Sequence, residues 1–173
     1  MTTANNLTLV RIALIPVFLM VLYLGFPGAH WWALGIFIAA SLTDLLDGYV
    51  ARHYNQITDF GKFMDPLADK MLVMAAMCWF VERGRMAGWA LALVLLREFA
   101  VSGMRLVAVE QGRVIAAGWS GKVKTASTMV CLCLMLAVQL GWLDLVCELV
   151  ILATTVYSGA EYFVKNKDVF RSA

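Results

Sequence analysis

The sequence predicts an all-α membrane protein, a single domain over residues 1–173 that crosses the bilayer with six helices. Two global observations indicate a membrane protein. Hydrophobic residues make up 62% of the chain and charged residues only 15%, whereas soluble domains average about 45–50% apolar and about 25% charged residues. The mean hydropathy is +0.78. No segment is polar enough to form a separate soluble domain.

The third observation is a series of six apolar stretches, each close to the ~20 residues that a helix needs to cross the hydrocarbon core. They cover residues 7–25, 31–52, 62–82, 86–108, 120–140 and 144–164. The short links at 25–28, 82–85 and 141–144 predict a compact up-and-down bundle. The first stretch has no basic segment before it and no cleavage site after it, so it is predicted to be a retained helix rather than a signal peptide.

The placement of lysine and arginine predicts the orientation of the bundle. One set of helix ends carries ten basic residues, and the opposite set carries only Arg83 and Arg85. Basic ends face the cytoplasm, so both termini are predicted to be cytoplasmic. The net charge of +2 gives no indication of nucleic-acid binding. The four cysteines lie in apolar runs without a CxxC pair, which argues against a zinc site or a disulfide framework.

Aspartate is concentrated in one short segment, residues 42–71. The segment holds five of the 12 acidic residues of the chain: Asp44, Asp47, Asp59, Asp65 and Asp69. Positions three or four apart share a helix face. The first two therefore form one pair and the last two another, at the cytoplasmic ends of consecutive helices. Asp59 lies off both pairs and is predicted to be a solvated residue of the connecting loop.

Four carboxylates that converge near a membrane need a counter-charge, because each ionisable residue at depth costs ~2.5–3.5 kcal/mol. Oxygen ligands without Cys or His favour Mg²⁺ or Mn²⁺, and four carboxylates suffice for two ions that activate a phosphoryl displacement. The small residues Gly48, Ala51 and Gly61 would leave room for a ligand, and Arg52 suits a bidentate phosphate contact. For any single aspartate, a plain helix-end charge in the headgroup region is the alternative.

The segment from Asp44 to Asp69 reads D-x-x-D-G-x-x-A-R, eight further residues and G-x-x-x-D-x-x-x-D. This pattern resembles the signature of the CDP-alcohol phosphotransferase family, and all eight defining positions are present. The resemblance implies a six-helix, usually dimeric fold of the inner membrane with two metal ions at its cytoplasmic surface. Such enzymes transfer a phosphatidyl or similar group from a CDP-linked donor to an alcohol and release CMP.

The resemblance also implies roles for single residues. By position, Asp44, Asp47 and Asp65 would bind the ions, and Asp69 would be both a ligand and the general base. The residues implied to lie against the cytidine diphosphate are Gly48, Ala51, Arg52 and Gly61.

Further stretches, residues 6–11, 97–105, 121–125 and 158–163, resemble the bacterial phosphatidylglycerophosphate synthase subgroup of this family. The resemblance implies a homodimer in the bacterial inner membrane, with its active site facing the cytoplasm. CDP-diacylglycerol would be the donor and glycerol 3-phosphate the acceptor. Substrate contacts are also implied for Asn6, Thr8 and Arg11.

The predicted ligands of the acceptor phosphate are Arg97, Arg105 and Lys122. The two arginines are eight residues apart, roughly on one helix face, and a bare charge inside a membrane helix is costly. A structural ion pair between Arg97 and Glu98 is the alternative. For Lys122 and Lys124 the alternative is ordinary headgroup binding, and Lys122 is preferred over Lys124 for the pocket.

Other functions differ in what they require of the sequence. Phosphatidylinositol-phosphate synthase and a CDP-diacylglycerol-dependent cardiolipin synthase share the metal motif and differ in the acceptor pocket. A membrane prenyltransferase would need N/D-D-x-x-D motifs, which the chain lacks. A cation transporter would place its carboxylates at the bilayer midplane, whereas these lie at predicted helix ends.

Overall fold

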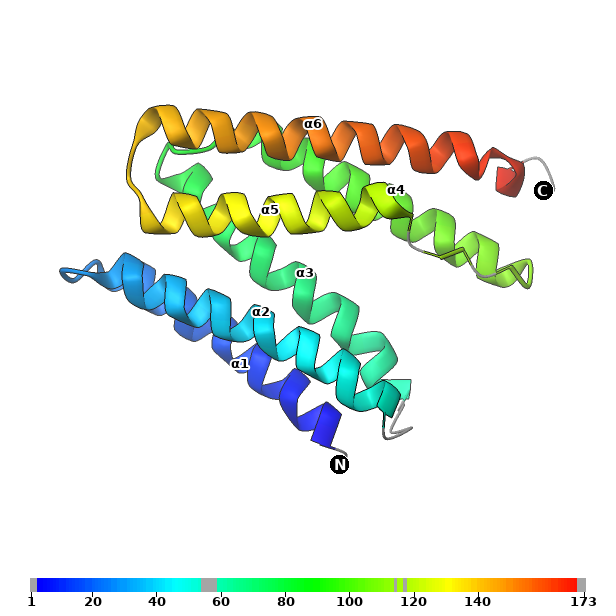
Figure 1. Ribbon diagram of the computed structural model, residues 1–173, viewed down its shortest axis with the longest axis horizontal. Helices are drawn as coiled ribbons and strands as arrows, with labels where there is room; N and C mark the ends of the chain where they lie inside the picture. Colours follow the sequence, from blue (N-terminus) through cyan, green and yellow to red (C-terminus); the bar gives the residue numbers. More distant parts are fainter. Residues whose placement is uncertain (1–2, 54–58, 114, 117, 171–173) are drawn as a thin grey trace. The chain divides into compact units, whose positions relative to one another are not determined.

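The computed structural model describes the backbone of residues 3–53, 59–113, 115–116 and 118–170. Within its helices, the side chains of residues 3–8, 44–53, 59–66, 69 and 169–170 lie outside the described part. The described residues form six α-helices, one 3₁₀-helix and no strand (Figure 1): α1 (Thr3–Leu24), α2 (Ala29–His53), α3 (Asp59–Glu82), α4 (Gly88–Glu110), α5 (Trp119–Ala137), α6 (Gly141–Lys165) and η1 (Lys167–Phe170). The predicted all-α class with six helices is confirmed.

Glycines in the left-handed region mark two of the predicted links. Gly25 and Gly28, with φ of 60° and 85°, lie in the turn between α1 and α2. Gly84, with φ of 67°, lies in the turn after α3. A side chain with a Cβ is strained in this conformation. The links at 25–28 and 82–85 are therefore confirmed, and glycine explains why the chain turns there.

The predicted link at 141–144 is wrong. The chain leaves the helical conformation at residues 138–140, and Leu140, with φ of −123° and ψ of 119°, is the extended residue before α6. Residues 141–144 form the first turn of α6 instead. A carboxylate in the first turn interacts favourably with the helix dipole, so Asp144 favours a helix start that Gly141 alone does not indicate.

The predicted loop position of Asp59 is also wrong. Asp59 is the first residue of α3, which begins earlier than the predicted start at residue 62. Aspartate is favoured at helix starts because its carboxylate can satisfy free backbone N–H groups and complements the dipole. The side chain of Asp59 itself lies outside the described part.

The described contacts group the chain into two compact units. The first comprises Met1–Phe80 and Leu136–Gln139, and the second comprises Val81–Met135 and Leu140–Ala173. Each unit has buried apolar side chains of its own. That the whole chain forms one domain stays a prediction.

In the first unit, α1 and α2 pack as an antiparallel hairpin (Figure 1). Phe18 of α1 and Phe37 of α2 are fully buried, and their ring centroids are 6.0 Å apart. Leu22 and Ala33 are buried as well. Apolar burial on this scale stabilises the pair by roughly 2 kcal/mol for each large side chain. The hairpin therefore anchors the N-terminal half of α2, and the aspartate motif begins in the half that follows.

In the second unit, α4 packs against α6, and α5 runs antiparallel to α6 (Figure 1). Val101, Met104 and Ala108 of α4 form a buried cluster with Tyr162 of α6. Spacings of three and four residues place the α4 members on one helix face. This face fixes α4 against the C-terminal half of α6, and α4 also carries Arg97, Glu98 and Arg105 of the candidate site.

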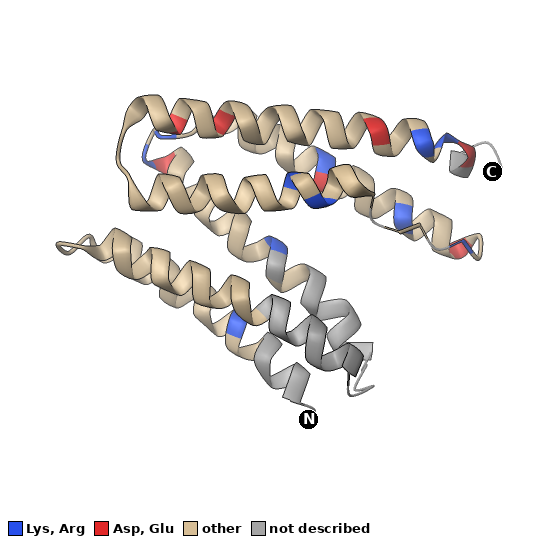
Figure 2. Ribbon diagram, in the orientation of Figure 1, with Lys and Arg blue, Asp and Glu red and all other residues tan. Residues whose placement is uncertain are grey.

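Helix α6 has the length and composition of a membrane span. Its most apolar 18-residue window has a mean hydropathy of 1.5. Among the described residues, α6 is the one helix that is both long enough and apolar enough to cross a membrane. Figure 2 shows that the charged residues of α6 lie toward its two ends. Shorter apolar segments occupy Leu9–Leu24 and Ala29–Thr43. That all six helices cross the bilayer stays a prediction.

A buried ion pair joins the turn after α3 to the start of α6. Arg85 donates from Nε to Oδ2 of Asp144 at 2.8 Å and from Nη2 to Oδ1 at 2.7 Å. Its Nη2 also donates to the carbonyl of Met135 at 2.8 Å. Glu148, one turn further along α6, accepts from the backbone N–H of Ala87 at 3.3 Å. We call these five residues the Arg85 clasp, and they hold together the start of α4, the end of α5 and the start of α6.

Replacing Arg85 by alanine is expected to lower the free energy of unfolding by about 3 kcal/mol, because removal of one partner leaves the other charge buried without compensation. The side chains of Arg85 and Asp144 are only 18% and 8% exposed. Thermal unfolding of the purified protein in detergent measures the effect. Arg83→Ala is the matched control, since Arg83 is exposed in the same turn. A melting temperature of Arg85→Ala equal to that of the wild type would show that the clasp contributes no stability.

Candidate active site

Both aspartate pairs lie within helices. Asp44 and Asp47 belong to α2, and Asp65 and Asp69 belong to α3. Their separations of three and four residues place each pair on one helix face. The described side chains include no group of three or more potential metal ligands, and these four carboxylates lie outside that part of the chain. Their convergence on a metal stays a prediction.

The remaining residues of the motif lie on the same two helices. Gly48, Ala51 and Arg52 are in α2, and Gly61 is in α3. These four residues also lie outside the described side chains. The predicted contacts to cytidine diphosphate therefore lie on the same two helices as the aspartate pairs, and their roles stay predictions.

The predicted substrate contacts at the N-terminus lie on α1. The side chains of Asn6 and Thr8 are outside the described part. Arg11 is described, and only 1% of its surface is exposed. Arg11 is therefore a buried charge and not a surface one, although a guanidinium is costly to bury.

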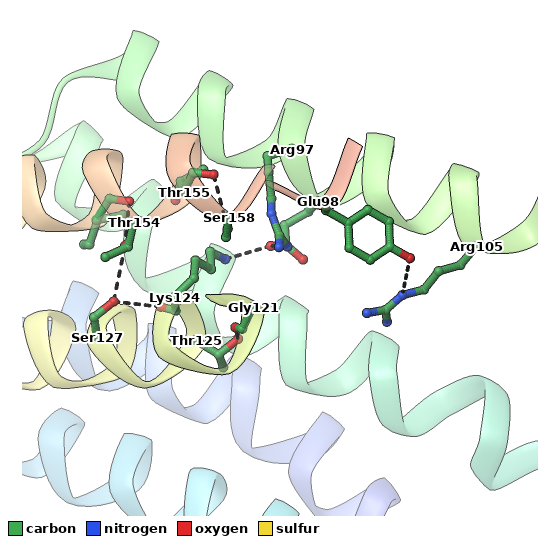
Figure 3. A network of polar contacts seen from close by, with 12 residues as sticks. Arg97, Glu98, Arg105, Gly121, Lys124, Thr125, Ser127, Thr154, Thr155 and Ser158 are labelled. Carbon is green, nitrogen blue, oxygen red and sulfur yellow. Dashed lines mark hydrogen bonds and ion pairs between the residues drawn. The ribbon is translucent and has the colours of Figure 1, made fainter. Parts of the chain in front are cut away.

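A buried cluster of charged side chains lies in the second unit (Figure 3). We call it the Glu98 cluster; it consists of Arg97 and Glu98 of α4 and Lys124 of α5. Oε1 of Glu98 accepts a hydrogen bond from Nη1 of Arg97 at 2.9 Å and another from Nζ of Lys124 at 2.7 Å. The three side chains are 13%, 12% and 7% exposed. The ion pair between Arg97 and Glu98 exists, and it has a third member.

The Glu98 cluster carries a net positive charge, since it combines two cations with one carboxylate. Nε of Arg97 is buried and has no hydrogen-bond partner among the described residues. Thr128, four residues beyond Lys124 on α5, has a buried hydroxyl that also finds no partner in the described part of the chain. An uncompensated buried charge is expensive. The cluster therefore offers charge and donor groups to an anionic ligand.

Arg105 lies eight residues beyond Arg97 on α4 and contacts Tyr162 of α6. Its Nε donates to Oη of Tyr162 at 3.2 Å, and its guanidinium carbon is 5.6 Å from the centroid of that ring. Tyr162 also lines a cavity of about 360 Å³. The other polar residues that line it are Arg113, Ser120, Glu161, Lys165 and Asn166. Small-molecule sites have volumes of about 300–1,000 Å³, so the cavity is large enough for a small phosphate ester.

The structure separates the two lysines of α5. Lys122 is exposed, whereas Lys124 is buried and contacts Glu98. Positions two apart on a helix do not share a face. The sequence analysis preferred Lys122. The role of Lys124 could not be read from the sequence, because its contact with Glu98 joins residues 26 positions apart and leaves no local signal. The contact between Arg105 and Tyr162 was missed for the same reason.

Comparison with known proteins gives the class to which this helical fold and its charged site belong. The family model described as CDP-alcohol phosphatidyltransferase matches residues 1–157. The match includes both aspartate pairs and the Glu98 cluster. The chain belongs to the CDP-alcohol phosphatidyltransferase family.

Particular relatives are similar over most or nearly all of the chain. The CDP-diacylglycerol–glycerol-3-phosphate 3-phosphatidyltransferase of Bacillus subtilis is 39% identical over an alignment of 188 residues, which covers 98% of this chain and 97% of the relative. The protein of that name from Rickettsia bellii is 35% identical over 173 residues, with 96% of each chain covered. The one from Salmonella typhimurium is 43% identical over 131 residues, 73% of this chain and 71% of the relative.

Proposed function

We propose that this chain transfers the phosphatidyl group of CDP-diacylglycerol to glycerol 3-phosphate, which yields phosphatidylglycerol phosphate and CMP in anionic phospholipid biosynthesis. One observation carries the proposal. All eight motif positions are intact in a chain whose similarity to a relative named for this reaction covers 98% of its length. The Glu98 cluster supports the choice of acceptor, because a buried excess of positive charge suits a phosphate ester.

The donor set of the motif fits divalent ions. Asp44, Asp47, Asp65 and Asp69 offer only carboxylate oxygens, which are the ligands that hard cations prefer. We propose that these residues hold two ions, Mg²⁺ or Mn²⁺. Bound there, the ions would stabilise negative charge on the transferring group and on the departing CMP.

The protein's own groups bind the substrates and accept the proton. Asp69 takes the proton of the 1-hydroxyl of glycerol 3-phosphate, and general-base catalysis of this kind accounts for ~10²–10⁴-fold in rate. The hydroxyl oxygen attacks the phosphatidyl phosphorus, and a new P–O bond forms as the bond to CMP breaks. Direct attack is favoured because none of the eight defining positions of the motif is a Ser or His that could act as a nucleophile.

The remaining predicted residues bind and orient the two substrates. The proposed contacts to cytidine diphosphate are Gly48, Ala51, Arg52 and Gly61. Asn6, Thr8 and Arg11 are proposed as further substrate contacts. The proposed ligands of the acceptor phosphate are Arg97, Arg105 and Lys122, to which burial and contact with Glu98 add Lys124. Bidentate arginine contacts suit phosphate geometry.

The proposed setting is the bacterial inner membrane, crossed six times, with both termini and the active site on the cytoplasmic side. The distribution of basic residues supports this orientation, and the apolar composition of α6 supports the membrane location. The acyl chains of the donor would remain in the bilayer. A homodimer is proposed from the family resemblance.

The test is CMP release by the purified protein given CDP-diacylglycerol, Mg²⁺ and one acceptor at a time. We expect release with glycerol 3-phosphate and none with inositol phosphate or phosphatidylglycerol. Release only with inositol phosphate or only with phosphatidylglycerol would keep the family chemistry and overturn the acceptor. No release with any of the three would contradict the proposed reaction, and ion transport in proteoliposomes would then be measured.

A further inference from the structure

The side chain of Arg97 passes close to Gly159 of α6, a residue without a side chain. A Cβ placed on Gly159 would lie 3.2 Å from Cγ of Arg97. Carbon atoms pack best at about 3.5–4.0 Å, so a methyl group at this position would press on the arginine. Gly159 is itself buried. The missing side chain of Gly159 thus provides the space through which Arg97 extends.

The far end of the same side chain is also constrained. Nη1 of Arg97 is bound to Glu98 at 2.9 Å, and a Cβ on Gly121 of α5 would lie 3.7 Å from Nη2, which is ordinary contact. Neighbouring positions on a helix do not face each other, so Arg97 must bend toward Glu98 to make this bond. A methyl group at Gly159 requires Cγ of Arg97 to move by a few tenths of an ångström, and the bond to Glu98 limits how far the side chain can adjust.

We propose that Gly159 is a positioning residue of the acceptor site: its missing Cβ lets Arg97 place its guanidinium beside Glu98, where it meets the phosphate of the acceptor. The inference rests on the proposed function. Gly159 touches no substrate and acts only through Arg97. A displacement of 1 Å in a catalytic constellation costs ~10²-fold, so the few tenths of an ångström that a methyl group requires should cost several-fold in acceptor use.

Three glycine-to-alanine variants form a graded test. Gly159→Ala should raise the KM for glycerol 3-phosphate by about three- to tenfold, with little change in kcat or in the KM for CDP-diacylglycerol. Gly121→Ala should have a smaller effect, because its Cβ would make only ordinary contact. Gly103→Ala of α4 is the matched control, since nothing lies within 4 Å of its Cβ position. Its KM values should equal those of the wild type.

A double variant tests whether the effect passes through Arg97. In Arg97→Ala the side chain ends at Cβ, so adding Gly159→Ala should cause no further loss of kcat/KM for the acceptor. If Gly159→Ala alone folds poorly, thermal unfolding replaces the kinetic measurement. The double variant should then melt at a higher temperature than Gly159→Ala alone, because Arg97→Ala removes the side chain that the new methyl group presses on. A loss that persists unchanged in the Arg97→Ala background would overturn the inference.

The outcomes separate the inference from the function on which it rests. Wild-type CMP release with glycerol 3-phosphate, together with an unchanged KM in Gly159→Ala, would contradict the positioning role and leave the proposed reaction in place. Wild-type release only with another acceptor would contradict the proposed acceptor. In that case, the KM values of the three glycine variants for that other acceptor test the positioning role of Gly159 independently.

Discussion

Replacing Asp69 by asparagine is expected to reduce CMP release by at least ~10³-fold, because the change removes the proposed general base and weakens the binding of the metal ions. The amide has nearly the size of the carboxylate, so α3 should remain folded. The measurement is the initial rate of CMP release with both substrates at saturation. Circular dichroism of the same preparation checks that helix content is unchanged.

Asp59→Asn is the matched control for this prediction. It makes the same chemical change in the same helix, at the first residue of α3, which belongs to neither aspartate pair. Its activity should equal that of the wild type. A rate near that of the wild type for Asp69→Asn would show that this carboxylate is not the base. Equal losses in the two variants would mean that negative charge near the start of α3 matters and that the motif position does not.

Replacing Lys124 by methionine is expected to raise the KM for glycerol 3-phosphate by about 10- to 100-fold, because hydrogen bonds to charged groups contribute about 1.5–3 kcal/mol. In the variant, Glu98 would neutralise Arg97, and the cluster would lose its positive excess. Lys122→Met should raise the KM only by a few fold, since exposed ion contacts contribute about 0–1 kcal/mol. Steady-state kinetics with varied acceptor measure both values.

Two further measurements separate acceptor binding from stability. The KM for CDP-diacylglycerol should change little in Lys124→Met, because the proposed contacts to its cytidine diphosphate group lie on α2 and α3. Thermal unfolding shows how much the loss of the bond to Glu98 destabilises the protein. A lower melting temperature with an unchanged KM for the acceptor would give Lys124 a purely structural role. A larger effect of Lys122→Met than of Lys124→Met would restore the preference drawn from the sequence.

The helices of this protein could be predicted because apolar runs and glycine turns are local features. Gly25, Gly28 and Gly84 each adopt a positive φ at a predicted link. The errors occur where a polar residue extends a helix past the apolar pattern, as Asp59 does for α3 and Asp144 for α6. Hydrophobicity alone therefore locates the middle of a helix better than its first turn.

The candidate site also contains residues that a local pattern reveals and residues that only the folded structure brings together. The aspartate motif is contained in one segment, so its spacing can be read directly from the chain. The proposed acceptor pocket involves residues of α4, α5 and α6, and the contacts observed among them join distant positions, such as Glu98 with Lys124 and Arg105 with Tyr162. The sequence therefore predicted charges for this pocket, and only the packing of the three helices distinguishes Lys124 from Lys122.

The Arg85 clasp has a consequence for how the protein is made. Arg85 leaves the ribosome well before its carboxylate partner, and at about 5–20 residues per second the 59 residues between them take roughly 3–12 s to translate. During this interval the guanidinium must remain in water or among lipid headgroups, because its burial without Asp144 would be costly. The second unit can therefore bury this guanidinium only after the start of α6 has emerged, and the packing of Tyr162 against α4 follows later still.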